Sequence, residues 1–381
     1  MRRRGFLTIA SVGCGAVALV GLERAGQVGL LSSDEWKEAW GELGRERGLR
    51  AIVAAGVLAA NPHDSQPWRF RLGEDRLDLH LDPARALGPV DPFLRQMHLG
   101  IGCALENLAV GAAMVGLAAS IDLFPDSNDA TLAARLTLSG AAAPPSSHAD
   151  AITRRHTNRG PYDPTRPVAA QVRAALEAQV REASTSLEMF DATSARGRAF
   201  SRAILESTVA LIEDDVFMRA TDAWFRWTPR EVFEHRDGPA LDCAGLTAMK
   251  RVAAQLGPRP SEASFRGSWL DSTREVHLAT APTFGVIAVR DPSRPAQLVE
   301  AGRLYQRIHL EATLQGIAMQ PLDQRLELVD RARQRGLAAP SATSVDLVLR
   351  GFVPIMMFRA GTPLRAAPPS ARRRLDEVLF V

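Results

Sequence analysis

The sequence predicts an α+β fold in which short strands alternate with long, buried helices. Short runs of alternating apolar and polar residues lie between turns containing Gly or Pro, as half-buried strands do. Two much longer segments indicate helices, one rich in Gly and Ala and the other amphipathic. The composition, 46% hydrophobic and 23% charged in 381 residues, is globular. This length suits two domains, or one large fold with a duplicated core.

Residues 1–30 predict an export signal. An arginine triplet precedes a Gly- and Ala-rich apolar run, and residues 3–7, RRGFL, are similar to the RR-x-F-L core of twin-arginine signals. No clean A-x-A cleavage sequence follows, which leaves cleavage open. A used signal implies the twin-arginine translocase as a partner and a location on the periplasmic side, exported or membrane-associated. A short anchor, or the N-terminal helix of a cytoplasmic protein, is the alternative.

The first half of the chain, 31–145, predicts helices separated by short strands. The Ala-rich segment 33–60 stops at Asn61-Pro62, because proline cannot continue a helix. Residues 94–118 are apolar almost all round but carry charged side chains, which favours a buried core helix over a membrane span. The remaining elements are a hairpin of 68–72 with 76–82, strands at 121–124 and 134–140, and a linker at 141–148.

The second half, 148–381, predicts a similar mixture. Residues 296–318 form an amphipathic helix with Leu298, Tyr305 and Ile308 on its inner face. The other expected elements are helices at 168–183 and 196–226, strands at 186–190 and 284–291, a loop at 227–245, and one or two strands within 345–363. A shift of 200 positions superimposes the two long helices and pairs Gly102 with Gly302 and Ala112 with Ala312. In an Ala-rich chain these identities alone do not establish a duplication.

Charge and motif content exclude several classes of protein. The net charge is only +3, which does not favour a nucleic-acid binder. The three cysteines, Cys14, Cys103 and Cys243, are far apart and predict neither a disulfide framework nor a metal site. No G-x-S-x-G, H-E-x-x-H, Walker loop or strand-linked G-x-G-x-x-G occurs.

Two polar segments could bind a ligand. In residues 152–162, ITRRHTNRGPY, Arg155, His156 and Arg159 surround the hydroxyl of Thr157, and forked guanidinium groups with a hydroxyl suit a phosphate. A solvated helix start is the alternative. In residues 59–68, AANPHDSQPW, the side chains of Ser65 and Gln66 suit the edge of a planar ligand. An ordinary Asn-Pro turn is the alternative there. Arg372 and Arg373 of the tail could add charge, or be solvated.

Four segments in order resemble motifs of FMN-dependent nitroreductases. SQPWRF follows an Ala-rich helix, as the S/N-x-Q-P-W-x-F segment of that family does. RHTNR resembles the R-x-S-x-K/R phosphate motif with Thr for Ser, GIAMQPLD (316–323) the segment beside the isoalloxazine, and PPSARRRLDEVL the family's ending. Gln-Pro-Trp lies before the Arg motif, and each motif occurs once. This arrangement resembles the Acg family, in which two nitroreductase-like halves are fused and one flavin site is retained.

The resemblance implies a nitroreductase fold in which the two halves form an intramolecular pseudo-dimer and bind one FMN. Monomers are then an option, because fusion removes the usual reason to dimerise. The implied contacts are Arg155, His156, Thr157 and Arg159, helped by Arg372 or Arg373, at the phosphate and ribityl groups; Ser65 and Gln66 at the ring; and the backbone of Pro321, Leu322 and Asp323 at its reactive edge. Segment 227–245 resembles a lid, with Trp227, Arg230, Asp237 and Gly238, although a plain surface loop is the alternative.

The implied reaction is reduction of a nitroaromatic or quinone-like acceptor through FMN, for which the protein needs no catalytic acid, base or nucleophile of its own. NAD(P)H is the candidate electron donor, but an exported protein would not meet it. A protein that stores or sequesters FMN with little turnover is therefore the alternative. An exported binding module without flavin is a third reading, which a colourless preparation would indicate.

Overall fold

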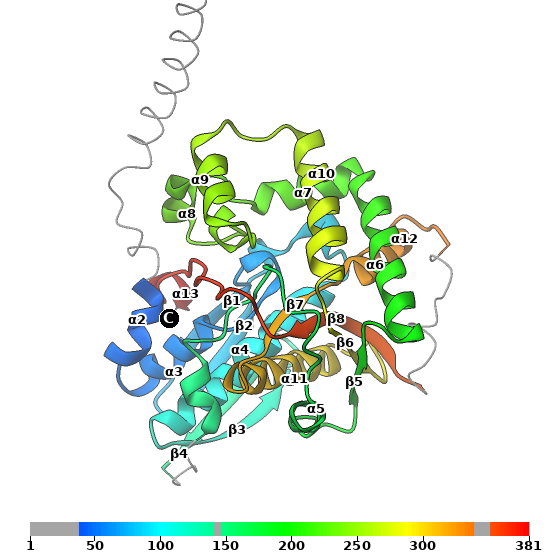
Figure 1. Cartoon of the computed structure of the whole chain (residues 1–381). Coiled ribbons are helices and arrows are strands. Elements are labelled where there is room, and N and C mark those ends of the chain that lie inside the picture. The colour runs from blue at the N-terminus through cyan, green and yellow to red at the C-terminus, as the bar shows by residue number, and fades with distance from the viewer. Residues whose placement is uncertain (1–37, 141–145, 339–350, 381) are drawn as a thin grey trace, which may run out of the picture.

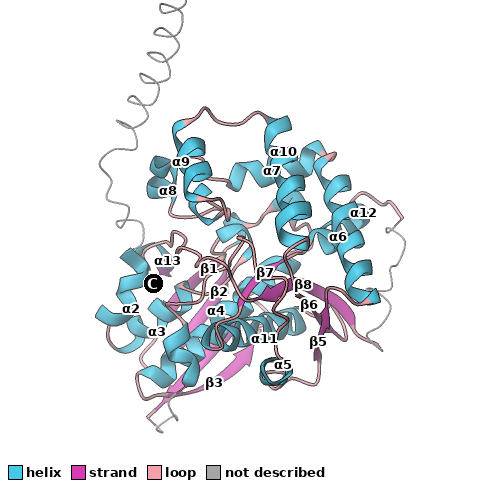
Figure 2. Cartoon of the chain, viewed as in Figure 1, coloured by secondary structure: helices cyan, strands magenta, loops and turns pink. Residues whose placement is uncertain are grey.

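The computed structural model describes residues 38–140, 146–338 and 351–380. The predicted export signal lies outside these ranges, as does most of the linker predicted at 141–148. Within them the chain is α+β, as the sequence predicts. Its helices and strands are drawn in chain order in Figure 1 and by type in Figure 2.

The strands form two sheets that lie on either side of a layer of long helices (Figure 1). The first sheet has the order β3 (Ala118–Leu123), β4 (Leu132–Ser139), β2 (Arg76–Leu81), β1 (Trp68–Leu72) and β9 (Leu379–Phe380). The second has the order β5 (Thr185–Asp191), β6 (Thr283–Val289), β8 (Val353–Gly361) and β7 (Ala318–Pro321). Strand β9 runs parallel to β1, so the C-terminal tail crosses from the second sheet to the first.

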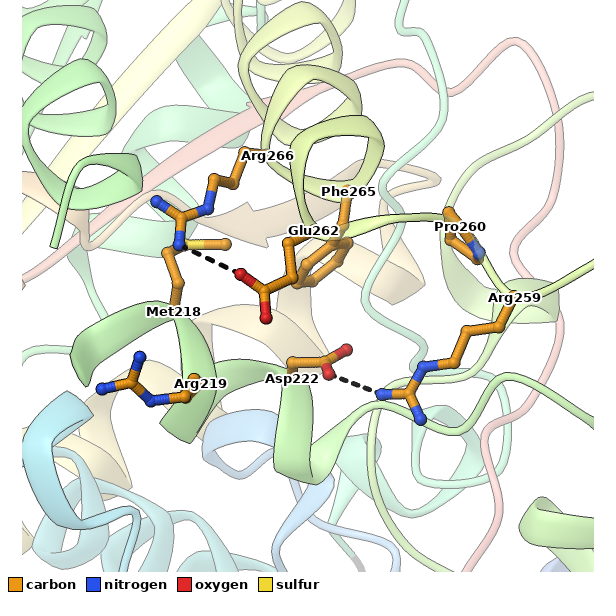
Figure 3. Close-up of a pocket in the computed structure, with 8 residues that line it drawn as sticks. All are labelled: Met218, Arg219, Asp222, Arg259, Pro260, Glu262, Phe265 and Arg266. Carbon is orange, nitrogen blue, oxygen red and sulfur yellow. Dashed lines mark hydrogen bonds and ion pairs between the residues drawn. The ribbon is translucent and has the colours of Figure 1, made fainter. Parts of the chain in front are cut away.

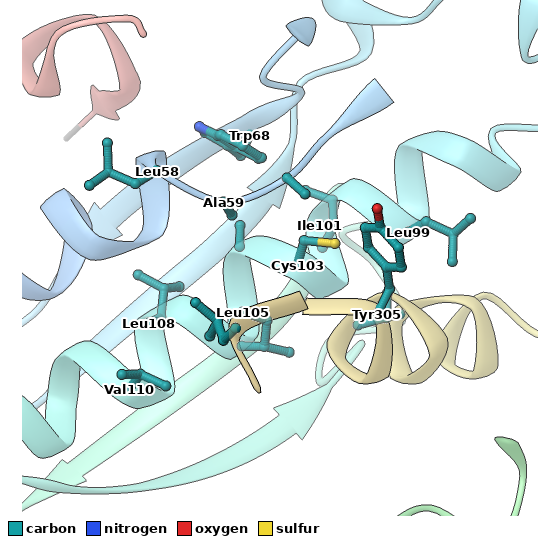
Figure 4. Packing of buried hydrophobic residues seen from close by; sticks show 14 of the residues in the cluster. Leu58, Ala59, Trp68, Leu99, Ile101, Cys103, Leu105, Leu108, Val110 and Tyr305 are labelled. Atoms are coloured by element: carbon teal, nitrogen blue, oxygen red, sulfur yellow. The ribbon is translucent and has the colours of Figure 1, made fainter. Parts of the chain in front are cut away.

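The largest hydrophobic core surrounds helices α3 (Gly48–Val57), α4 (Arg95–Met114) and α11 (Pro295–Leu314). Helix α4 is long and apolar enough to cross a membrane, but 83% of its apolar stretch is buried in the protein, in agreement with the predicted core helix. Figure 4 shows Trp68 from β1, Cys103 from α4 and Tyr305 from α11 among the side chains of this core.

Helices α4 and α11 cross at Gly102 and Gly302, and the contact is reciprocal. A methyl group on Gly102 would overlap the carbonyl oxygen of Val299, and one on Gly302 would overlap that of Leu99. Leu99 and Val299 are themselves 200 positions apart, like the two glycines. The shift that superimposes the two helices in the sequence therefore also relates their contacts in space.

A group of helices is inserted between β5 and β6. These are α6 (Ala195–Ile212), α7 (Asp215–Trp224), α8 (Pro229–His235), α9 (Ala248–Leu256) and α10 (Glu262–Asp271), followed by a π-helical turn at Ser272–Leu278. In Figure 1 they lie together on one side of the two sheets. The other helices are α2 (Glu38–Arg45), α5 (Ala170–Glu177), α12 (Gln324–Gln334) and α13 (Leu375–Val378).

Several predicted boundaries are wrong for local reasons. The helix predicted at 196–226 is two helices, because the Asp214 carboxylate accepts hydrogen bonds from the amides of Val216 and Phe217 at 3.0 and 3.1 Å and so begins α7. The loop predicted at 227–245 contains α8, which starts with a capping box of Thr228 and Glu231. The predicted helix 33–60 is divided between α2 and α3 around Gly48, whose φ is +56°.

Candidate functional site

The turn that carries Ser65 and Gln66 joins α3 to β1 and has an unusual backbone. His63, Asp64 and Gln66 have φ angles of 48°, 48° and 49°, in the left-handed region that non-glycine residues rarely adopt. The Asn61 side chain stabilises the turn by accepting a hydrogen bond from the amide of Gln66 at 2.8 Å. Such residues cost about 1–3 kcal/mol each and persist where the surroundings hold them, often at functional sites. This is not the ordinary Asn-Pro turn that the sequence left as an alternative.

Gln66 is fully buried, and its side-chain amide is bonded within the protein. Its Nε2 donates to the carbonyl of Arg236 at 2.8 Å, and its Oε1 accepts from the amide of Arg373 at 2.7 Å. Gln66 therefore ties its turn both to the inserted helices and to the C-terminal tail. Ser65 is also fully buried, and its hydroxyl has no hydrogen-bond partner among the described residues.

The Arg motif, residues 155–159, lies beside this turn. Arg155 is 2% exposed and donates to the carbonyl of Leu58 at 2.9 Å, while its Nε has no partner among the described residues. Burial, reinforced by the nearby charge of Arg372, lowers the pKa of Arg155 to about 10, so the side chain is still a cation at neutral pH. Arg154 is exposed.

The other residues of the motif have different surroundings. His156 packs edge-on against Trp40, with the ring centroids 4.6 Å apart. Burial, followed by the charges of Arg155 and Arg372, lowers the pKa of His156 to about 3, so its ring is neutral at pH 7. Thr157 is half-buried, and Arg159 donates to the carbonyl of Cys243 at 3.3 Å.

The C-terminal tail brings Arg372 to the same place. Arg372 is 3% exposed, pairs with Asp64, and donates to the hydroxyl of Ser370 at 2.6 Å and to the carbonyl of Ala59 at 3.2 Å. The guanidinium of Arg372 also lies over the Trp40 ring, 5.3 Å from its centroid. Trp40, which contacts both Arg372 and His156, carries no motif that the sequence analysis could have recognised.

Four buried polar atoms of these segments lack a hydrogen-bond partner among the described residues: Asp64 Oδ2, Ser65 Oγ, Arg155 Nε and Arg372 Nε. An unpaired buried polar atom costs roughly 1–3 kcal/mol, so a cluster of them needs an explanation. Three of the four belong to groups that can donate, and two are cationic. The residues present therefore fit an anionic, hydrogen-bonding group such as a phosphate ester.

Residues 321–323 are linked to the Arg motif through the main chain, since the amide of Asn158 donates to the carbonyl of Met319 at 3.1 Å. The Asp323 carboxylate is occupied elsewhere, because it accepts from Arg95 at 3.1 Å and from the amide of Met357 at 2.8 Å. Leu322 is buried and its amide donates to the carbonyl of Met357, whereas Pro321 is half-buried. The expected contact of the backbone of residues 321–323 with the flavin ring therefore stays a prediction.

The predicted lid residues separate into two groups. Asp237 pairs with Arg85 and Arg226, and the amide of Gly238 donates to the carbonyl of Asp64 at 3.2 Å, so this part touches the Ser65–Gln66 turn. Trp227 instead packs against Phe225 and Phe265 within the inserted helices, and the exposed Arg230 pairs with Glu234.

A cavity of about 280 Å³ also lies in the inserted helices (Figure 3). Its walls come from α7, α10 and the loop between α9 and α10, and include Met218, Asp222, Arg259, Phe265 and Arg266. Arg259 and Asp222 face each other across it and form an ion pair. None of the lining residues belongs to the motifs that the sequence analysis identified.

Glu327 belongs to a buried cluster of carboxylates beside Asp323 and gives a pH-dependent prediction. Burial, and then the charge of Asp323, raises the pKa of Glu327 from 4.5 to about 8. Between pH 4.5 and about 8 the folded protein thus keeps a proton on Glu327 that the unfolded chain has lost. The stability that depends on the neutral form of Glu327 is fully present below pH 4.5 and is lost as the pH rises to about 8. Glu327→Gln has a neutral side chain at every pH and can still bond to Gln96. We therefore expect the difference in the free energy of unfolding between the variant and the wild type, measured by chemical denaturation, to grow in favour of the variant by about 3–5 kcal/mol from pH 5 to pH 9. A constant difference across this range would contradict the assignment.

The chain is similar in sequence to known proteins along most of its length. No family model matches the chain. Two proteins of Mycobacterium tuberculosis that carry the provisional name NAD(P)H nitroreductase are each 26% identical to it. One aligns over 339 residues, 87% of this chain and 90% of its own length, and the other, Acg, over 346 residues, 87% and 95%.

The chain is also similar to solved structures of nitroreductases. The FMN-dependent nitroreductase NfnB of Mycobacterium smegmatis, in complex with NADPH, covers 61% of this chain and 98% of its own, with 17% identity and a TM-score of 0.37. A nitroreductase with bound FMN from Desulfitobacterium hafniense covers 62% and 98%, with 14% identity and a TM-score of 0.36.

The sequence relatives extend along most of this chain and most of their own length. Together with the four motifs in order, they make the chain similar, over most of its length, to proteins named as nitroreductases. The similarity to Acg agrees with the resemblance that the order of the motifs carries.

Proposed function

We propose that the protein is an FMN-binding oxidoreductase of nitroreductase type that reduces nitroaromatic or quinone-like acceptors, with NAD(P)H as candidate donor. The names of its sequence relatives support this function. The observation that carries it is the cluster of buried, unpaired donors at Ser65, Arg155 and Arg372, which come from three distant parts of the chain. Bound FMN would supply the two-electron redox chemistry.

Each half of the chain would contribute to one cofactor site. Arg155, Thr157 and Arg159 would hold the phosphate and ribityl groups, with Arg372 or Arg373, because guanidinium groups form forked bonds to phosphate oxygens. Ser65 would reach the ring through its unpaired hydroxyl. Gln66 would act mainly by holding the turn, because both ends of its amide are already bonded to Arg236 and Arg373.

Residues 236–246 would exclude water from this site. The turn at Asp64–Gln66 is bonded to Arg236 and Gly238, and the segment also lies directly on the Arg motif. A methyl group on Gly245, whose φ is +76°, would overlap the carbonyl of Arg159 and lie 2.7 Å from the amide of Gly160. A cover held at both ends restricts which acceptors reach the flavin.

Stopped-flow reduction tests turnover. Mixing the flavin-loaded protein with NADH, NADPH or a quinol should bleach the flavin absorbance within seconds, and adding a nitroaromatic or a quinone should restore it. If the flavin absorbance falls too slowly to support turnover with each of the three donors, the enzymatic proposal is contradicted.

FMN storage or sequestration is the second candidate function. It is favoured by the same cover, because the bonds from Gln66 and Asp64 to residues 236–238 must break before a bound group can leave. Under this alternative the protein holds FMN tightly, releases it slowly into flavin-free buffer, and shows no rapid bleaching in the stopped-flow experiment.

We also propose that the two halves act as a pseudo-dimer with a single site, so that the protein works as a monomer. The reciprocal packing of Gly102 and Gly302 and the single occurrence of each motif support this proposal. Light scattering of the flavin-loaded protein should give the mass of one chain. A stable dimer would contradict it.

Export by the twin-arginine route remains a proposal that rests on residues 1–30. Fusion of these residues to a folded reporter should direct the reporter across the membrane. Replacing Arg3 and Arg4 by lysine should abolish this transfer, and equal transfer by the lysine variant would contradict the proposal.

A further inference from the structure

Arg359 lies on β8 in the middle of the second sheet and is completely buried. Its guanidinium donates in three directions, and the acceptors are neutral oxygens. They are Gln320 Oε1 at 2.7 Å, the carbonyls of Gly160 and Asn158 at 2.7 and 3.3 Å, and, at 3.3–3.4 Å, Thr280 Oγ1 and the carbonyls of Val276 and His277. Arg359 therefore joins the Arg-motif loop, strand β7 and the π-helical turn at one point.

Two of these acceptors flank Arg159 of the Arg motif. The carbonyl of Asn158 precedes Arg159 and that of Gly160 follows it, and both accept from Nη2 of Arg359, whose orientation is fixed by the bonds of Nε and Nη1 to β7 and the π-helical turn. The hydroxyl of Tyr162 donates to the same Asn158 carbonyl at 2.8 Å, and the Arg359 guanidinium lies 3.9 Å from the centroid of the Tyr162 ring.

Buried histidines hold other parts of the loop. His277 is hydrogen-bonded to the main chain of Arg159, and His309 of α11 to that of His156. Burial, and then the charge of Arg359 for His277 and of Arg155 for His309, lowers both pKa values well below the usual range, so both rings are neutral at pH 7. The loop backbone is thus fixed by buried side chains from three separate elements.

The charge of Arg359 is costly where it lies. Burial lowers its pKa to about 10, but the group remains ionised at neutral pH, and among the described residues its hydrogen bonds go to carbonyl, amide and hydroxyl oxygens rather than to a carboxylate. A buried cation without a bonded acid is retained where its geometry is needed. Lysine keeps the charge but offers three donors from one atom, whereas arginine offers five in a planar fork.

We propose that Arg359 is a positioning residue that aligns the Arg motif for binding the phosphate of the cofactor. It acts through the carbonyls of Asn158 and Gly160 and does not itself touch the ligand. This inference rests on the proposed FMN site, and it specifies that binding of the FMN phosphate, rather than of the ring, depends on Arg359.

The test compares two ligands that differ only in the phosphate, FMN and riboflavin, with flavin-free full-length protein and fluorescence titration. For Arg359→Lys we expect FMN affinity to fall about 10- to 100-fold, while riboflavin affinity changes less than about threefold. Tyr162→Phe removes only one hydroxyl and should weaken FMN binding about threefold while leaving riboflavin binding unchanged. If Arg359→Lys does not fold, Tyr162→Phe is the variant that tests the proposal. Equal losses for both ligands, or unchanged FMN affinity, would overturn the proposal.

Arg307→Lys is the matched control. Arg307 is equally buried, but it bonds to Glu106 at 3.1 Å, to Glu182 and to the carbonyl of Gln179 at 3.1 Å rather than to the Arg-motif loop. We expect it to leave the ratio of FMN to riboflavin affinity unchanged, and a ratio that falls as far as in Arg359→Lys would overturn the proposal. The wild type separates this inference from the proposed function, because a wild type that binds neither ligand refutes the FMN site itself.

Discussion

Gly102→Ala is expected to lower the free energy of unfolding by about 3 kcal/mol or more, or to prevent folding. The added methyl group would overlap the carbonyl oxygen of Val299 and lie 2.8 Å from Cα of Gly302 and from the amide of Arg303. All three are backbone atoms, so no side-chain rotation relieves the clash, and α4 and α11 must move apart along the centre of the core. Chemical denaturation followed by circular dichroism measures the change.

Gly267→Ala is the control for this substitution. Gly267 also lies within a helix, α10, but a methyl group there meets no atom of the described residues within 4 Å. We expect it to stabilise the protein by about 0.5–1 kcal/mol, because alanine is the better helix former. Gly302→Ala should behave like Gly102→Ala, since the crossing is reciprocal. Wild-type stability in both crossing variants would show that the two halves do not pack as described.

Arg155→Ala is expected to weaken FMN binding by about 30-fold or more. It removes a buried cation whose Nε is unpaired, and a charge-assisted hydrogen bond to a phosphate contributes about 1.5–3 kcal/mol. The ratio of FMN to protein after purification and the dissociation constant after reconstitution both report the loss.

Arg154→Ala is the matched control, because it removes the same charge from the neighbouring, exposed position. We expect it to keep FMN at the wild-type ratio. Equal retention by Arg155→Ala would show that the phosphate is held elsewhere, and equal loss in both variants would show that only the overall charge of the loop matters.

Patterns that depend on local sequence predicted much of the fold. The alternation at 68–72 and 76–82 predicted the β1–β2 hairpin, the Gly- and Ala-rich segment 94–118 predicted α4, and the amphipathic segment 296–318 predicted α11. The break at Asp214 was missed because its capping role competes with a helical pattern that continues past it, and an ion pair from Arg331 at 2.8 Å strengthens that cap from outside the segment. The pairing of β9 with β1 could not be predicted, because nothing in either sequence identifies the partner.

The candidate site was predictable only where a motif carried it. The sequence singled out Arg155, Ser65 and Arg372, and the structure brings them together, although their contacts with a cofactor stay a prediction. It did not indicate that the Gln66 amide and the Asp323 carboxylate already have partners within the protein, since those partners, Arg236 and Arg95, are far away in the chain. A single arginine in the apolar strand VPIMMFRAG was a signal for Arg359 that the motif search did not use.

The flavin content of the purified full-length protein tests the central claim most directly. Denaturing the protein, separating the released chromophore and quantifying it against the amount of chain gives both the identity and the stoichiometry of the cofactor. A single cofactor site in two fused halves predicts a yellow protein that releases one FMN per chain. A colourless protein that does not take up FMN, or one that holds two FMN per chain, would contradict it.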